Sequence, residues 1–328
     1  MSKDLILSCP SVDSDRIGEM KNNIARWFAT PSLSRLVSLF GENVPDGLGL
    51  KELSKWYLDF SDCWDFRNRQ KQAFDSKVGE GARWLLNSDE LTDEHKEQAL
   101  ETALDLGLRN NDMASREEFD YVWVLGGAKL SCLLRCRLAK QSVQRMGNKP
   151  RAIVLLGSAR PIGDAEREAT NTYAPDAVTE FDLFVSAAQK EFGVSDVYTE
   201  ERHDDSDNAN NSWVVRKYEA NGQDIFIIAA PSSDPDKRRA NSADTYEFFF
   251  NNFNAPEGSA ILLTTSQIYV PYQHLEAVRT IAIPHGIYLD TIGFIPEWGG
   301  DLQGMNEPSN YLQEIRSTIQ AIDRFLSQ

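Results

Sequence analysis

The chain has 328 residues, 34 of them basic and 50 acidic, and a formal net charge of −16. This charge argues against a general nucleic-acid binder and against docking on anionic membrane, because both depend on clustered Lys and Arg. No apolar run approaches the ~20 residues of a membrane span, and residues 1–10 lack the features of a signal peptide. We therefore expect a cytoplasmic protein whose partner is a small-molecule ligand.

The first 118 residues are predicted to be helical. Apolar residues recur there at three- and four-residue spacing, in segments near 15–29, 31–40, 50–60, 65–87 and 92–107. Thr92 is of a residue type that caps helices, and the acids after it suit a first turn. The polar stretch 109–120 follows, so we predict a helical region over 1–118 and an α/β domain over 119–328.

After residue 120, short apolar runs alternate with amphipathic segments. Five runs are predicted as strands: 121–125, 152–156, 224–230, 260–263 and 287–289. Because these runs are apolar throughout, they suit strands covered on both faces, and the alternation indicates a parallel sheet. We predict an α/β fold with a Rossmann-like, mostly parallel five-stranded sheet. Residues 213–220 are predicted as an extra strand or hairpin arm.

Small or hydroxylated residues follow nearly every predicted strand. They are Gly126-Gly127, Gly157-Ser158-Ala159-Arg160, Pro231-Ser232-Ser233, Thr264-Thr265-Ser266 and Asp290-Thr291. Ligands of open parallel sheets bind at the carboxyl ends of the strands, where small residues let backbone N–H groups approach an anion. The other interpretation is that small residues simply suit tight turns.

Three basic residues near these ends are candidate anion contacts. Lys129 follows the first glycine pair, Arg160 follows the second strand, and Arg239 precedes a predicted helix start that contains Asp244 and Thr245. Neither the full GxGxxG nor the Walker pattern occurs. The alternative is that the basic residues form solvated surface.

His274 is a candidate general acid or base, since its ordinary pKa is near neutrality; a capping or hydrogen-bonding role is the alternative. No GxSxG motif supports a hydrolase elbow. Cys132 and Cys136 lack a second Cys or His pair nearby, so no metal site is expected. The turn after the first strand predicts that Gly126→Val removes ligand binding and leaves the fold largely intact, because glycine tolerates dihedral angles that Val does not.

The order of these motifs resembles the YdcF/SanA-like family of bacterial proteins. The residues that carry the resemblance are Val124 to Gly127, Leu156 to Ser158, Ser242 to Glu247 and Leu263 to Ser266, with His274 and Arg279 behind them, over about residues 121–293. The resemblance implies a Rossmann-like fold and a nucleotide-type ligand such as S-adenosylmethionine.

Two functions follow from the sequence. The first is binding of a nucleotide-type or other anionic small molecule. This function includes an enzyme that acts on a phosphorylated or adenosyl-containing substrate. Its expected contacts are Gly126, Gly127, Lys129, Gly157, Ser158, Arg160, Ser232, Ser233, Arg239, Asp244, Thr245, Thr265 and Ser266. The second is a non-catalytic regulatory or protein-binding module, because no recognisable nucleophile–base pair is present. The sequence defines neither a reaction nor an oligomeric state.

Overall fold

The computed structural model describes residues 15–70, 86–109, 114–253, 255–304 and 306–328. Its N-terminal part is helical, as predicted. The helices are α1 (Arg16–Phe28), α2 (Pro31–Leu39), α3 (Leu50–Phe60), α4 (Phe66–Arg69) and α5 (Asp93–Asp105). The predicted cap is confirmed, because Thr92 Oγ1 accepts a hydrogen bond from the His95 amide at 3.2 Å. Most of the helix predicted over 65–87 lies outside the described residues.

The sheet has seven strands, so the prediction of five is wrong. They are β1 (Tyr121–Leu125), β2 (Ala152–Gly157), β3 (Thr199–His203), β4 (Trp213–Ala220), β5 (Gln223–Ala229), β6 (Ala260–Ser266) and β7 (Tyr288–Phe294). Their order is β3-β4-β5-β2-β1-β6-β7. The neighbouring pairs β5–β2, β2–β1, β1–β6 and β6–β7 are parallel, whereas β3–β4 and β4–β5 are antiparallel.

The two additional strands differ in how visible they are in the sequence. β4 confirms the expected extra strand over 213–220. β3, with the sequence TEERH, is an edge strand with mostly exposed side chains, so it carries no apolar signal. Two predicted strand ends are also wrong. β6 continues to Ser266 and β7 to Phe294, which places Thr264 and Thr265, and likewise Asp290 and Thr291, inside strands.

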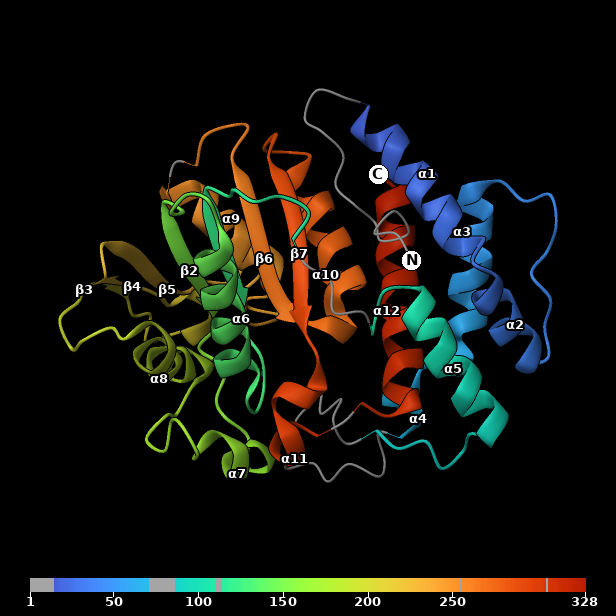
Figure 1. Ribbon diagram of the computed structural model, residues 1–328, viewed down its shortest axis with the longest axis horizontal. Coiled ribbons are helices and arrows are strands. Elements are labelled where there is room, and N and C mark those ends of the chain that lie inside the picture. Colours follow the sequence, from blue (N-terminus) through green and yellow to red (C-terminus); the bar gives the residue numbers. More distant parts are fainter. Residues whose placement is uncertain (1–14, 71–85, 110–113, 254, 305) are drawn as a thin grey trace.

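Helices cover both faces of the sheet. The face of α6 (Ser131–Arg145), α7 (Arg167–Thr170) and α8 (Glu180–Phe192) packs on Val122 and Val124 of β1. The face of α9 (Ser242–Phe253), α10 (Val270–Ala277) and α12 (Pro308–Leu326) packs on Trp123 and Leu125. Successive strand residues point to opposite faces, which is why a five-residue apolar run serves both cores. The short helix α11 (Gly300–Gln303) contacts α7 at the carboxyl edge (Figure 1).

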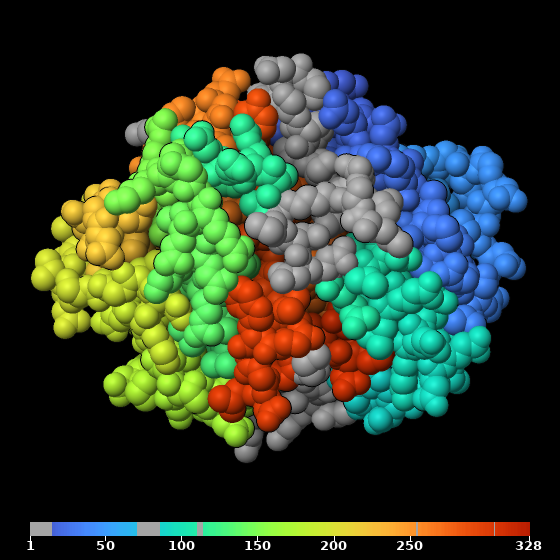
Figure 2. Space-filling model, in the orientation of Figure 1, coloured from blue at the N-terminus to red at the C-terminus, as the bar shows by residue number. Residues whose placement is uncertain are grey.

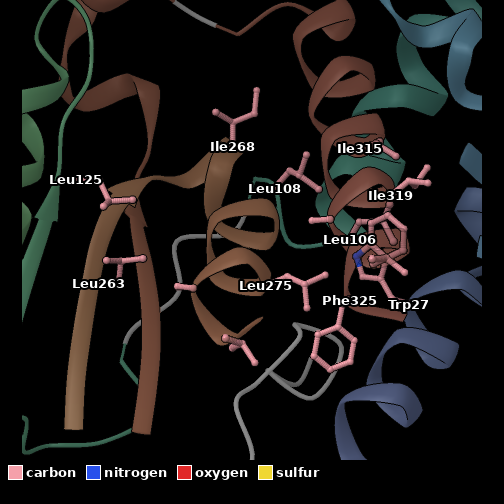
Figure 3. Close-up of a cluster of buried hydrophobic side chains, with 14 of the residues drawn as sticks. Trp27, Leu106, Leu108, Leu125, Leu263, Ile268, Leu275, Ile315, Ile319 and Phe325 are labelled. Carbon is pink, nitrogen blue, oxygen red and sulfur yellow. The ribbon is translucent and has the colours of Figure 1, made fainter. Parts of the chain in front are cut away.

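The C-terminal helix α12 connects the sheet to the N-terminal helices. It lies between α10 on one side and α3 and α5 on the other (Figure 1). Its Ile315 and Ile319 belong to one hydrophobic cluster with Trp27 of α1 and Leu263 of β6 (Figure 3). On the face drawn in Figure 2, C-terminal residues in red reach the surface between α6 and α5. The division into parts 1–118 and 119–328 stays a prediction.

Candidate functional site

A cavity of about 440 Å³ lies at the carboxyl ends of β1 and β2. Side chains and backbone from the loops after β1, β2 and β5 line it, together with the first turns of α8 and α9. The lining residues are Leu125, Gly126, Leu156, Gly157, Ser158, Arg160, Glu180, Arg238, Arg239, Ala240, Asn241, Ser242, Thr245, Tyr246 and Gln273. Its size is in the range that small-molecule ligands occupy.

Gly126 directly follows β1 and lies against the carboxyl group of Glu180. A Cβ atom on Gly126 would lie 2.2 Å from Glu180 Oε1 and 3.1 Å from the Leu156 carbonyl oxygen. Gly126 does not have a positive φ; the left-handed residue of this loop is Lys129, with a φ of 53°. Our expectation that the turn needs unusual glycine dihedrals is therefore wrong. The physical reason for glycine is the close approach of the Glu180 carboxylate.

The loop after β2 is fastened to the start of α8. The amides of Glu180 and Phe181 donate to the carbonyl oxygens of Arg160 and Ser158 at 2.9 and 3.0 Å. Thr179 Oγ1 accepts from the Asp182 amide and completes a capping box. The first amides of α8 are thus already bonded within the protein and are not directed at the cavity.

Arg160 is held between two buried carboxylates. Its Nη1 and Nη2 donate to the two carboxylate oxygens of Glu166 at 2.6 and 3.1 Å, and its Nε donates to Glu180 Oε2 at 3.4 Å. Ser158 Oγ donates to Glu180 Oε1 at 3.1 Å. Arg160 lines the cavity, but its charge is balanced by the protein's own acids.

Burial raises the pKa of Glu180, although Arg160, Ser158 and Arg135 each act to lower it. Arg135 of α6 is 2% exposed and lies beside the same loop. Its Nη1 donates to the carbonyl oxygens of Leu125 and Gly126, and its Nη2 donates to Ser266 Oγ at 2.9 Å. The guanidinium therefore holds the ends of β1 and β6 together.

The loop before α9 is organised by Asp244. Both carboxylate oxygens of Asp244 accept from the Arg238 guanidinium, and Arg238 Nη2 also donates to Ser233 Oγ at 2.8 Å. Burial would raise the pKa of Asp244, but the bonds from Arg238 and Ser233 outweigh it and lower the pKa to about 2. Asn241 Oδ1 accepts from the Asp244 amide and caps α9.

The start of α9 carries hydrogen-bond donors that are available to a ligand. Within the described ranges, Arg239 forms no ion pair, and the amides of Ser242 and Ala243 have no hydrogen-bond acceptor. Arg239 and Ser242 both line the cavity. Since a helix N-terminus carries partial positive charge, this end of the cavity favours an anion.

The carboxyl ends of β6 and β7 contribute less to the cavity. Thr265 Oγ1 donates to Gln273 Oε1, which is how Gln273 is fixed at the cavity wall. His274 is 2% exposed, and its Nδ1 shares a hydrogen bond with Thr291 Oγ1 at 2.9 Å. His274 does not line the cavity, so this geometry favours the hydrogen-bonding role over the acid–base role.

The structure brings six predicted contacts to the cavity wall. These are Gly126, Gly157, Ser158, Arg160, Arg239 and Thr245. The other seven predicted contacts are not among the lining residues: Gly127, Lys129, Ser232, Ser233, Asp244, Thr265 and Ser266. Lys129 is placed toward Glu166, to which its amide donates at 3.4 Å.

The sequence reasoning missed Glu180 as a residue of this wall, and it did not name Tyr246 or Gln273 as ligand contacts. A signal for Glu180 exists in the chain. Thr179 and Asp182 form a capping box, which marks Glu180 as the first residue of a helix that follows β2.

A second hollow, of about 610 Å³, lies between α2 and α5. Its wall includes Arg35 and Glu101, which pair with each other and are each about half exposed. It lacks both the strand ends and the buried charged network of the first cavity. We therefore take the cavity at the sheet edge as the candidate site.

In the part of the chain that the structure describes, no helix has the length and hydropathy of a membrane span.

Comparison with known proteins defines the family. A family model for the Rv3785 N-terminal domain matches residues 12–107, which contain α1 to α5 and end before β1. The chain is 33% identical to the uncharacterized protein Rv3785 of Mycobacterium tuberculosis and to Mb3814 of Mycobacterium bovis, over 95% of this chain and 91% of each relative. No solved structure matches the chain. The resemblance to the YdcF/SanA-like family is wrong, because the matching family model is a different one. The chain belongs to the family of the mycobacterial protein Rv3785.

Proposed function

We propose that the protein binds a nucleotide-type small molecule with an anionic phosphate or carboxylate group in the cavity at the carboxyl ends of β1 and β2. The observation that carries the proposal is the α9 end of this cavity, where Arg239 and Ser242 line the wall and the amides of Ser242 and Ala243 have no acceptor among the described residues. Arg238 adds positive charge there, although Asp244 balances it. An anion at this point would receive charge-assisted hydrogen bonds from side chain and backbone together.

The topology supports the same proposal. If the five parallel strands are numbered along the chain, their spatial order is 3-2-1-4-5, which is how the dinucleotide-binding sheet begins. We include a Rossmann-like architecture in the proposal on this ground. In such sheets the ligand lies beyond the carboxyl ends of the strands, close to the point where the strand order reverses. The cavity lies at β1 and β2, and β1 is the strand beside that point.

Titration calorimetry tests the proposal with four ligands: inorganic phosphate, AMP, NAD and S-adenosylmethionine. We expect at least one of them to bind, and Arg239→Gln to weaken that binding by about ten-fold or more, the effect of one lost charge-assisted hydrogen bond. Lys237→Gln is the matched control, since Lys237 is two residues away, exposed, and paired with Asp234 outside the cavity wall. Binding of none of the four, or equal losses in both variants, would contradict the proposal.

A further inference from the structure

The Glu180 carboxyl group is the acidic feature of the cavity wall. The side chain is 10% exposed, lines the cavity, and lies over Gly126 at the carboxyl end of β1. An ionised carboxylate has about four acceptor sites. Among the described residues two donors reach it, Ser158 Oγ on one oxygen and Arg160 Nε on the other. Acceptor capacity remains on both oxygens, at the wall of a cavity large enough for a ligand.

Burial without a full set of donors is costly for a charged carboxylate. The raised pKa of Glu180 expresses this cost, because burial outweighs the favourable effects of Arg160, Ser158 and Arg135. A ligand group that donates a hydrogen bond to Glu180 would therefore stabilise the bound state.

The charges around Glu180 indicate which kind of donor fits. At this end, the acids Glu166 and Glu180 are balanced by Arg160 and by Arg135, both of which act on the Glu180 carboxyl. A ligand ammonium would have to approach these two guanidinium groups. A neutral hydroxyl group meets no such repulsion, so the surroundings favour a hydroxyl donor.

The opposite end of the cavity differs in charge. Arg238 is paired with Asp244, and Asp234, which also acts on Arg238, is paired with Lys237, so the charge of Arg239 is the one left over at the α9 end. The cavity is thus positive at α9 and neutral, with an open acceptor, at α8. A ligand complementary to both ends has an anionic group on one side and free hydroxyl groups on the other.

We infer that the cavity takes a phosphate monoester that carries free hydroxyl groups, such as a ribose phosphate, with its phosphate beside Arg239 and a hydroxyl donating to Glu180. This inference rests on the proposed function and adds the substrate class. The ribose phosphate could be a free sugar phosphate or part of a nucleotide, which share this chemistry.

The test compares AMP with 2′,3′-dideoxy-AMP, which keeps the phosphate and base and lacks the ribose hydroxyls. For the wild-type chain, we expect calorimetry to show AMP binding about ten-fold tighter or more, since a hydrogen bond to a charged group is lost in the analogue. Ribose 5-phosphate distinguishes the two sources: comparable binding indicates a sugar phosphate, and much weaker binding than AMP indicates a nucleotide.

Two variants locate the effect. Glu180→Gln keeps the side-chain shape and should reduce the difference between AMP and its dideoxy analogue to about two-fold or less. Glu191→Gln should leave the difference unchanged, because Glu191 lies on the same helix and pairs with Arg137 away from the cavity.

The wild-type comparison does not depend on the folding of any variant. Equal binding of AMP and dideoxy-AMP, or full discrimination in Glu180→Gln, would overturn the inference and leave the proposed function standing. If no phosphate compound binds, the inference falls; binding of S-adenosylmethionine alone would leave the broader function in place, whereas binding of none of the four ligands would remove both.

Discussion

At the residue scale, the contact between Gly126 and Glu180 shows how a missing side chain shapes the site. The Glu180 carboxylate occupies the space that a Cβ atom on residue 126 would take. The glycine therefore allows a charged group of α8 to reach the end of β1. The loops after β1 and β2 and the start of α8 therefore lie together in one wall of the cavity.

Gly126→Ala should destabilise the protein. The added methyl group would overlap Glu180 Oε1 and crowd the Leu156 carbonyl oxygen, and overpacking of this kind costs about 1–3 kcal/mol. Urea unfolding measures the change. Gly147→Ala is the control, because its Cβ would be 3.7 Å from the nearest atom, an ordinary contact. Equal midpoints for the two variants would show that the Glu180 contact is not close. The earlier expectation that Gly126→Val leaves the fold largely intact is replaced by this one.

The lowered pKa of Asp244 predicts that the stability of the fold depends on pH. Its pKa of about 2 in the folded state is below the ~3.9 of an unfolded Asp. Ionised Asp244 therefore stabilises the fold fully above about pH 4, and this contribution is lost as pH falls from about 4 toward 2. Asp244→Asn should lower the free energy of unfolding by about 1 kcal/mol at pH 7, after allowance for solvent screening.

Unfolding of wild type and Asp244→Asn from pH 7 to pH 2 measures this contribution. The difference between them should shrink below pH 4. Asp234→Asn breaks an exposed ion pair with Lys237 and should cost about 0.5 kcal/mol or less at any pH. A pH-independent difference for Asp244→Asn would contradict the role of its charge.

At the scale of elements, Arg16 connects α1 to the sheet. Its Nη1 donates to the Ala282 carbonyl at 2.7 Å and its Nη2 to the Ile287 carbonyl at 2.6 Å. These carbonyls lie at the end of the π-helix Val278–Ala282 (η8) and just before β7. The Ala282 carbonyl also accepts from the Ile287 amide at 3.0 Å, so Arg16 adds a charged donor from a distant helix to carbonyl groups on either side of this turn.

Arg16→Met keeps an unbranched chain and removes both hydrogen bonds. We expect a loss of about 2–4 kcal/mol, because two buried carbonyl groups lose their charged donor. Arg26→Met on the exposed face of the same helix should cost less than about 1 kcal/mol. Hydrogen exchange of the amides near Ile287 should accelerate only in the Arg16 variant; unchanged exchange would mean that this connection contributes little.

At the scale of the whole molecule, one hydrophobic cluster runs from the N-terminal helices through α12 to the sheet. Trp27, Leu106, Ile319, Leu275 and Leu263 are all buried in it (Figure 3). Because α12 contributes to both sides, neither the N-terminal helices nor this face of the sheet is buried without it. The two predicted parts should therefore unfold together.

Ile319→Ala should lower stability by about 2–5 kcal/mol, the usual cost of a cavity at a buried aliphatic residue. In calorimetry we expect one transition, shifted as a whole, for both wild type and variant. Ile292→Ala truncates another buried isoleucine, on the opposite face of the sheet, and is the control for the size of the truncation. Two separate transitions, of which Ile319→Ala moves only one, would show that the parts are energetically independent.

Much of the fold could be predicted from local patterns. The helical spacing before residue 109, the five apolar strands and the β4 arm are visible because their periodicity follows from burial of their own side chains. β3 could not be found this way, because a strand at the sheet edge needs only a backbone partner. The ends of β6 and β7 were placed too early, since hydroxyl-bearing residues can continue a buried strand when their hydroxyls find partners, as Thr264 Oγ1 does at the Trp123 carbonyl.

The sequence by itself determined which small, donor-rich residues follow the parallel strands, because the composition of a loop is a local property. Only the tertiary structure decided which charges remain available there. Arg160 is balanced by Glu166 and Glu180, and the first amides of α8 are bonded to the loop after β2. The amides of Ser242 and Ala243 at the start of α9 have no acceptor among the described residues. Pairing of these charges depends on how the irregular loop between the charged residues folds, and residue spacing alone does not encode that fold.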